Sequence, residues 1–172
     1  MKRRSIAPTQ IERPMREGDY IISSTDPKGR ITAVNDILVE FSGYSREELI
    51  GAQHNILRHP DMPRAVFWLA WDAISNGEDF SGYIKNLAKD GSHYWVFAHI
   101  VPEYAGGAIK GYRSVRRCPK QSAVAKAATL YAEMLAAEHQ AGPKDAIPAG
   151  LAVLSGLLAE RRVSYAQLVA EL

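Results

Sequence analysis

Several side chains that can bind an organic ligand stand together in the block His54-Asn55-Ile56-Leu57-Arg58-His59-Pro60-Asp61-Met62-Pro63. The Arg58 guanidinium can pair with two phosphate oxygens at once, and His59 beside it is a second hydrogen-bond donor. Asp61 can accept a hydrogen bond from a sugar hydroxyl or cap the helix that follows it. Each has a plainer reading, because a single arginine is usually a solvated surface charge and a single aspartate usually an N-cap.

Two further side chains, Trp71 and Asn86, could contact a flat ring system. Stacking on the Trp71 indole would be worth about 1–3 kcal/mol by analogy with the stacking of bases on aromatic side chains. The Asn86 amide is both donor and acceptor, so its preferred orientation could reverse when a ligand atom gains a proton. Taken singly, Trp71 is more often a core aromatic residue and Asn86 a turn or edge residue.

Metal and nucleophile sites are disfavoured by the spacing of the residues they need. His54 and His59 are five residues apart, which is poor helical spacing for a shared ligand face, and His93 and His99 would lie about 20 Å apart along a strand. No Gly-x-Gly-x-x-Gly or Gly-x-Ser-x-Gly pattern occurs. A single cysteine, Cys118, excludes an internal disulfide and any Cys-x-x-Cys motif.

The elements that must position these residues follow from hydrophobic periodicity and from turn and cap signals. Alternation predicts strands over 20–25, 29–34, 80–87, 93–101 and 109–116. Helices are expected after Asn35 or Asp36, after the Ser45 capping box, and from Asp61-Met62-Pro63 to Asn76-Gly77. We expect helices over 123–140 and 151–160 and after Ser164, separated at Gly142-Pro143 and Ile147-Pro148. The fold class is therefore α+β.

The order of two strands, short helices and a three-strand meander resembles a PAS domain, in which a five-stranded antiparallel sheet carries short helices on one face. The local sequence carries the likeness further. The block at 54–63 resembles a segment shared by the PAS domains of aerotaxis receptors, and the residues at 41–44, 85–86, 89–95 and 111–116 agree with the same family. The resemblance covers about residues 20–118, which leaves an arm at 1–19 and a helical tail at 119–172.

The resemblance implies a non-covalently bound FAD through which the domain reads redox state or oxygen. The cofactor-binding residues expected on this basis are His54, Arg58, His59, Asp61, Trp71, Phe80 and Asn86. At position 80 this chain has phenylalanine where the family has tryptophan. Phe80 can still stack on a ligand ring, but it lacks the indole N–H donor. Asn86 is the best candidate for the isoalloxazine edge, with His54 near it.

Other PAS cofactors fit less well. Haem-binding PAS domains commonly use a histidine on the central helix, and residues 63–76 contain none. Domains that form a cysteinyl flavin adduct need a thiol just before that helix, whereas Cys118 follows the last strand.

Composition and charge narrow the functional class. The net charge of the 172-residue chain is +2, and residues 1–19 contain five Lys/Arg against three Asp/Glu, so the excess lies in the arm. Nucleic-acid binding is disfavoured because no basic patch follows. Lys2-Arg3-Arg4 precedes no apolar run, and the longest apolar stretch, 147–159, is too short to cross a bilayer, so we expect neither a signal peptide nor a membrane span.

We expect a cytoplasmic FAD-binding redox sensor that is not an enzyme, as in aerotaxis and chemotaxis. Its partner would be a signalling protein or an output domain, or a second copy in a homodimer. The alternative is a cofactor-free PAS module that works by dimerisation or docking. A flavin-dependent oxidoreductase is a weaker reading, because no nicotinamide-binding fingerprint is visible.

Overall fold

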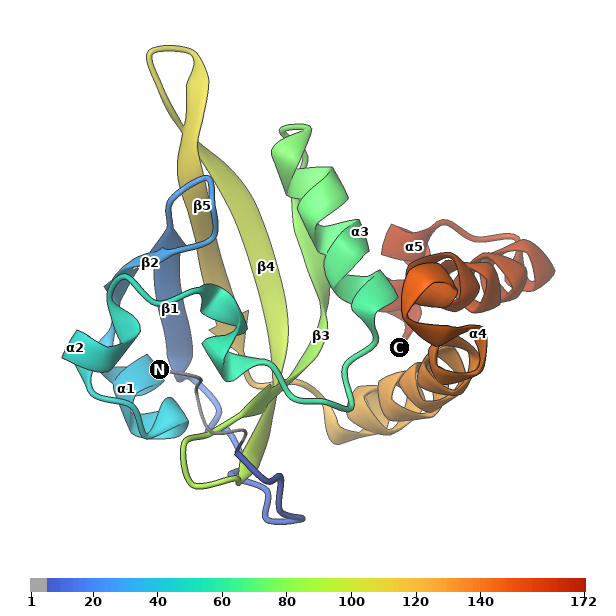
Figure 1. Ribbon diagram of the computed structural model, residues 1–172, viewed down its shortest axis with the longest axis horizontal. Coiled ribbons are helices and arrows are strands. Elements are labelled where there is room, and N and C mark those ends of the chain that lie inside the picture. Colours follow the sequence, from blue (N-terminus) through green and yellow to red (C-terminus); the bar gives the residue numbers. More distant parts are fainter. Residues whose placement is uncertain (1–5) are drawn as a thin grey trace.

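A computed structural model describes residues 6–172 and confirms the predicted α+β class. The elements in chain order are β1 (Tyr20–Thr25), β2 (Ile31–Val34), α1 (Asp36–Ser42), α2 (Arg46–Leu49), the 3-10 helix η1 (His54–Leu57), α3 (Arg64–Ser75), β3 (Phe80–Leu87), β4 (His93–Ala105), β5 (Ala108–Arg117), α4 (Gln121–Arg161) and α5 (Tyr165–Glu171). Figure 1 shows α1, α2 and α3 arranged along one side of the strands.

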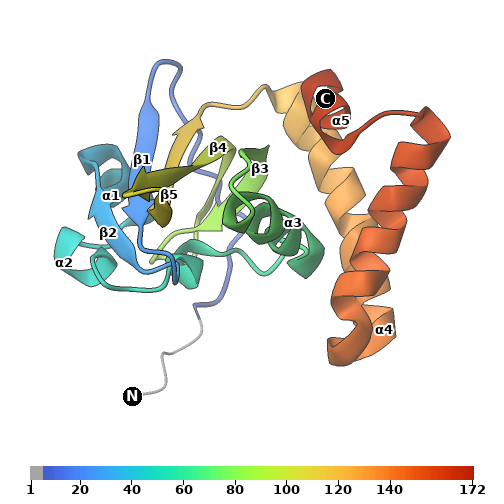
Figure 2. The same ribbon diagram turned by 90° about the horizontal axis from the view of Figure 1, so that it is seen from above.

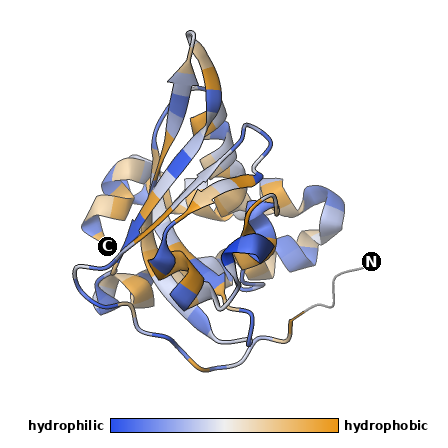
Figure 3. Ribbon diagram, turned by 90° about the vertical axis from the view of Figure 1, so that its left-hand side faces the viewer, coloured by the Kyte–Doolittle hydropathy of each residue, from blue (hydrophilic) through white to orange (hydrophobic). Residues whose placement is uncertain are grey.

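The five strands form one antiparallel sheet in the order β2-β1-β5-β4-β3. Hydrophobic and hydrophilic residues alternate along the strands (Figure 3), so each strand presents different chemistry to the two faces of the sheet. The β4–β5 hairpin projects beyond the other strands (Figure 1), because both strands run further than the predicted 93–101 and 109–116. The three-strand meander is thus confirmed, with longer strands.

Local capping explains where α1 and α2 begin. The Asn35 side chain accepts from the Leu38 N–H, and Ser45 and Glu48 form the predicted capping box. The helix α3 differs from expectation. Its N-cap residue is Pro63, which has no capping side chain, and Asp61 lies outside the helix instead of capping it.

Residues 6–19 of the arm are held against the β3–β4 turn by backbone hydrogen bonds. The Thr9 N–H donates to the Gly91 carbonyl at 2.7 Å, and Arg13 N–H donates to the His93 carbonyl at 2.8 Å. Met15 is buried in the core. The residues Lys2-Arg3-Arg4 lie outside the described part of the chain.

The tail forms a helical hairpin beside α3 and the β3 edge (Figure 2). Gly142 has a φ of 79° and ψ of 173° inside α4, so the helix folds back there, as the Gly142-Pro143 signal predicts. The expected break at Ile147-Pro148 is wrong, because Pro148 lies within the second arm of α4. It stands near the start of that arm, where a missing N–H removes only one helical hydrogen bond.

Buried contacts fix the tail to the sheet and to α3. The Tyr131 hydroxyl donates to the Tyr83 carbonyl at 2.8 Å, and its ring stacks on Trp95 at 6.2 Å. The Glu138 carboxylate accepts from the backbone N–H groups of Arg64 and Ala65, each at 2.9 Å. Glu138 thereby caps α3 from a distance of more than seventy residues in the sequence.

Candidate ligand pocket

The main pocket of the PAS sheet lies between its inner face and the helices, with a volume of about 460 Å³. The strands contribute Ser23, Thr25, Ile84, Asn86, Ala98, Ile100, Tyr112, Ser114 and Arg116. The segment before α3 contributes Gln53 to Asn55 and Arg58, and α3 itself contributes Phe67, Trp68, Ala70, Trp71 and Ile74. The volume falls within the range of sites for small organic ligands.

Three polar atoms in this pocket are buried without a hydrogen-bond partner among residues 6–172. They are Asn86 Nδ2, Ser114 Oγ and Arg116 Nη1, and all three residues are less than a tenth exposed. An unsatisfied buried polar group costs about 1–3 kcal/mol. Their grouping in one cavity therefore indicates a site for a ligand that supplies complementary hydrogen-bonding atoms.

Arg116 brings a positive charge into the pocket wall. Its Nη2 donates to Ser23 Oγ at 2.6 Å and to His54 Nε2 at 2.7 Å. Within the described chain, no carboxylate pairs with it. Burial lowers the pKa of Arg116 to about 10, with the Tyr94 hydroxyl acting in the opposite direction, so the guanidinium stays charged at pH 7.

His54 faces the same guanidinium and is held neutral. Burial and then the Arg116 charge lower the pKa of His54 to about 3. Because Nε2 accepts from Arg116, the ring proton of the neutral imidazole is on Nδ1. His54 is thus a fixed tautomer at the pocket wall, and its N–H donor is separate from the nitrogen that Arg116 occupies.

Aromatic side chains also line the pocket. Trp71 meets Tyr112 edge-on, with ring centroids 5.4 Å apart, and 40% of Trp71 is exposed. A Cβ at Gly29 would come within 3.0 Å of the Trp71 ring, and Gly29 also has a φ of 77°. Only glycine meets both demands, so the β1–β2 turn can close against this indole.

Of the residues predicted for the site, His54, Arg58, Trp71 and Asn86 line this pocket. Arg58 pairs with Asn86 through an isolated antiparallel bridge, so the segment before α3 runs beside β3. The Arg58 guanidinium lies over the Phe67 ring at 4.4 Å. The ligand contacts assigned to these four residues remain predictions.

The structure does not bring His59, Asp61 or Phe80 into the pocket lining. Asp61 pairs with Lys85 at 2.7 Å, and its N–H donates to His59 Nδ1 at 3.1 Å. Phe80 is buried and its ring stacks on Tyr165 of α5, 5.7 Å between centroids. Ligand contact by these three residues also stays a prediction.

Arg116 and Ser114 also line this pocket but are not among the predicted site residues, although their strand was predicted correctly. A signal was available in the alternation of β5. Tyr112, Ser114 and Arg116 share parity, so the strand sends all three to one face. An arginine and a serine on the face that also carries a large aromatic residue indicate a polar pocket.

Two further absences hold for the described part of the chain, residues 6–172. No group of three or more His, Cys, Asp or Glu side chains is arranged to hold a metal ion. No helix there combines the length and the apolar character needed to cross a bilayer.

Comparison with known families identifies the class of the domain. Residues 31–115 match the family model described as the PAS fold, and the five-stranded antiparallel sheet has that architecture. This part of the chain is therefore a PAS domain. Over 123 residues the chain is 42% identical to the aerotaxis receptor of Escherichia coli (strain K12), which covers 72% of this chain and 24% of the receptor.

Solved structures agree on the fold. The PAS domain of a protein from Colwellia psychrerythraea has a TM-score of 0.54 at 29% identity and covers 58% of this chain and 86% of that one. The dark structure of the blue-light photoreceptor Aureochrome1 LOV has a TM-score of 0.58 at 20% identity, covering 63% and 82%. The chain spans about a quarter of the length of the aerotaxis receptor.

Proposed function

We propose that this domain binds FAD non-covalently and reports redox state or oxygen through changes in hydrogen bonding at the flavin. The observation that supports the proposal most is the buried Arg116, a cation without a carboxylate partner among residues 6–172, next to the unpartnered atoms of Asn86 and Ser114. The 42% identity to an aerotaxis receptor supports the same proposal.

The residues that line the main pocket fit the isoalloxazine ring of a flavin. The pyrimidine edge of an isoalloxazine offers carbonyl oxygens and ring nitrogens, which match the amide of Asn86, the hydroxyl of Ser114 and the free Nη1 of Arg116. The exposed indole of Trp71 supplies an aromatic surface for the ring system. A bound flavin supplies two-electron redox chemistry with proton uptake at N5.

The chain's own residues would respond in distinct ways. Asn86 can donate or accept, so rotation of its amide follows the protonation of a neighbouring ligand atom. Arg116 stabilises negative charge that develops beside it, since a buried cation acts strongly where the dielectric constant is low. His54 stays neutral and keeps its proton on Nδ1 while Arg116 occupies Nε2.

We further propose that the domain is not an enzyme, that it works in the cytoplasm, and that it passes its state to a signalling protein or output domain. A second copy of the chain is the alternative partner. The relatives support this reading, because the names of an aerotaxis receptor and a blue-light photoreceptor both describe sensory proteins.

Purification tests the proposal directly. The expected result is a yellow protein whose heat-released cofactor co-chromatographs with FAD, and Arg116→Met is expected to lower FAD occupancy. A colourless protein that binds neither FAD nor other flavins would refute the proposal and favour the cofactor-free docking module. Sustained turnover with NAD(P)H would instead indicate an oxidoreductase.

A further inference from the structure

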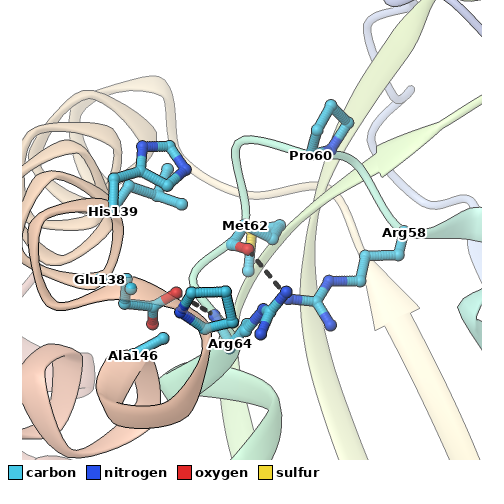
Figure 4. Close-up of a pocket in the computed structure, with 10 residues that line it drawn as sticks. Arg58, Pro60, Met62, Arg64, Glu138, His139 and Ala146 are labelled. Carbon is cyan, nitrogen blue, oxygen red and sulfur yellow. Dashed lines mark hydrogen bonds between the residues drawn. The ribbon is translucent and has the colours of Figure 1, made fainter.

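A second cavity, here called the α3–α4 groove, lies where the tail meets the start of α3. Its volume is about 300 Å³. Arg58 and Arg64 form its PAS side, and Leu135, His139, Pro143 and Ala146 form its tail side. Figure 4 shows Arg58 reaching toward Met62 and Arg64 from one side, with His139 and Ala146 on the tail opposite.

The groove and the main pocket share two residues. Arg58 and Arg64 line both cavities, and Ile147 of α4 lines the main pocket. The tail therefore borders the main pocket at the end where the groove begins. A ligand longer than one cavity could pass from one to the other beside these two arginines.

The two arginines have unused capacity for an anion. Neither forms an ion pair with a carboxylate anywhere in residues 6–172. Arg58 donates to the Met62 carbonyl at 3.2 Å, which leaves other guanidinium N–H groups free of assigned partners. Burial lowers the pKa of Arg58, and the Arg64 charge lowers it too, so the two cations act on each other.

Glu138 is the one carboxylate in the groove lining, and its oxygens are already committed. Each accepts from a backbone N–H at the start of α3, Arg64 for one and Ala65 for the other. The Glu138 charge raises the pKa of Arg58, but it does not replace a bound anion at the two guanidinium groups. The N-terminus of α3 is therefore capped by the protein, and the arginine side chains are left for a ligand.

We propose that the α3–α4 groove is the subsite for the adenylate half of FAD, so that the helical tail makes the domain select FAD over FMN. This inference rests on the proposed flavin function. Arg58 and Arg64 bind the pyrophosphate where the two cavities meet. Leu135, Pro143 and Ala146 give the adenosine an apolar surface, and His139 gives it a ring for stacking and an N–H donor.

Three ligands of increasing length divide the site into parts. Riboflavin tests the main pocket alone, FMN adds one phosphate, and FAD adds the adenylate. Dissociation constants are measured by quenching of flavin fluorescence with the flavin-free full chain. The variants are Arg64→Gln and His139→Ala, both at exposed positions, and the matched controls are Arg161→Gln and His99→Ala, exposed residues outside both cavities.

The wild-type chain is expected to bind FAD more tightly than FMN. Loss of a charge-assisted contact in Arg64→Gln raises the Kd of FMN and FAD about tenfold and leaves riboflavin unchanged. His139→Ala raises the Kd of FAD several-fold and leaves FMN and riboflavin unchanged. The controls bind all three ligands as the wild type does.

Equal affinity of the wild type for FMN and FAD, or equal effects of His139→Ala on all three ligands, would overturn the adenylate subsite while leaving a flavin sensor intact. A chain that binds none of the three ligands would overturn the flavin function itself. The two failures are thus distinguishable in one titration series.

Discussion

The stability of the flavin-free fold in acid should depend on His54. Burial and the charge of Arg116 lower the pKa of this imidazole from 6.5 to about 3. The unfolded chain therefore binds a proton at His54 more readily than the folded chain does. The contribution of neutral, buried His54 to stability is fully present above about pH 6.5 and is lost as the pH falls toward 3.

The magnitude follows from the two pKa values. With 6.5 for the unfolded chain and about 3 for the fold, the full loss is about 5 kcal/mol, and it is reached only below about pH 3, where His54 is protonated in both states. At pH 5 the same relation gives about 2 kcal/mol. Because the ring borders the main pocket and is only partly shielded, we expect about 1–2 kcal/mol at this pH.

Urea unfolding at pH 7.5 and pH 5.0 measures the effect. The perturbation is His54→Gln, which keeps an amide near Arg116 and removes the titration, and the control is His99→Gln at an exposed position. The wild type and the control should each lose about 1–2 kcal/mol more than His54→Gln between the two pH values. His59 and His93, whose pKa values are also lowered, contribute to all three proteins and cancel. An equal loss in all three proteins would refute the assigned environment of His54.

Three further outcomes are expected. Glu138→Ala removes the cap of α3 and should lower the free energy of unfolding by about 1–2 kcal/mol, whereas exposed Glu133→Ala should change it little; equal midpoints in urea would contradict the capping role. Arg116→Met removes a buried unpaired cation, so calorimetry of the flavin-free protein should show no loss of stability, while FAD affinity falls about tenfold. Gly150→Ala places a Cβ 2.6 Å from Glu138 Oε1 and should destabilise the tail. Gly156→Ala, whose Cβ would meet nothing within 4 Å, should stabilise α4 by up to about 1 kcal/mol. The melting temperatures of the two variants should therefore shift in opposite directions.

The parts of the fold that the sequence predicts well are those decided by neighbours in the chain. Asn35 and Ser45 cap the helices that follow them, because each cap needs only an N–H two or three residues ahead. Gly142 ends the first arm of α4 through its own backbone conformation. The positions of the five strands along the chain follow from local alternation of apolar and polar residues.

The parts that escape prediction depend on distant residues. Asp61 has the sequence position of a cap, but the start of α3 is capped by Glu138, which the folding of the tail brings there. Asp61 is instead held by Lys85 of β3. Pro148 is accommodated within a helix that packs against α3. The local rule that proline breaks a helix does not take such packing into account.

The site shows the same division. His54 and Asn86 could be selected by side-chain type within a motif, and both line the main pocket. Arg116 could not be selected by type, because an arginine on a strand is usually at the surface. Its importance comes from burial between Ser23 and His54, which lie far from it in the sequence.

The net charge of the folded part does not predict the charge inside its two cavities. Residues 20–172 contain sixteen Lys/Arg and sixteen Asp/Glu, so the folded part is neutral as a whole. Yet Arg58, Arg64 and Arg116 border the two cavities without an ion pair in the described chain, while acidic groups such as Asp61 pair elsewhere. The potential inside a cavity depends on the nearest uncompensated charges, since those at the surface are screened within about 8–10 Å. A folded region that is neutral as a whole can therefore hold a positive pocket, and the ligand that completes it should carry negative charge.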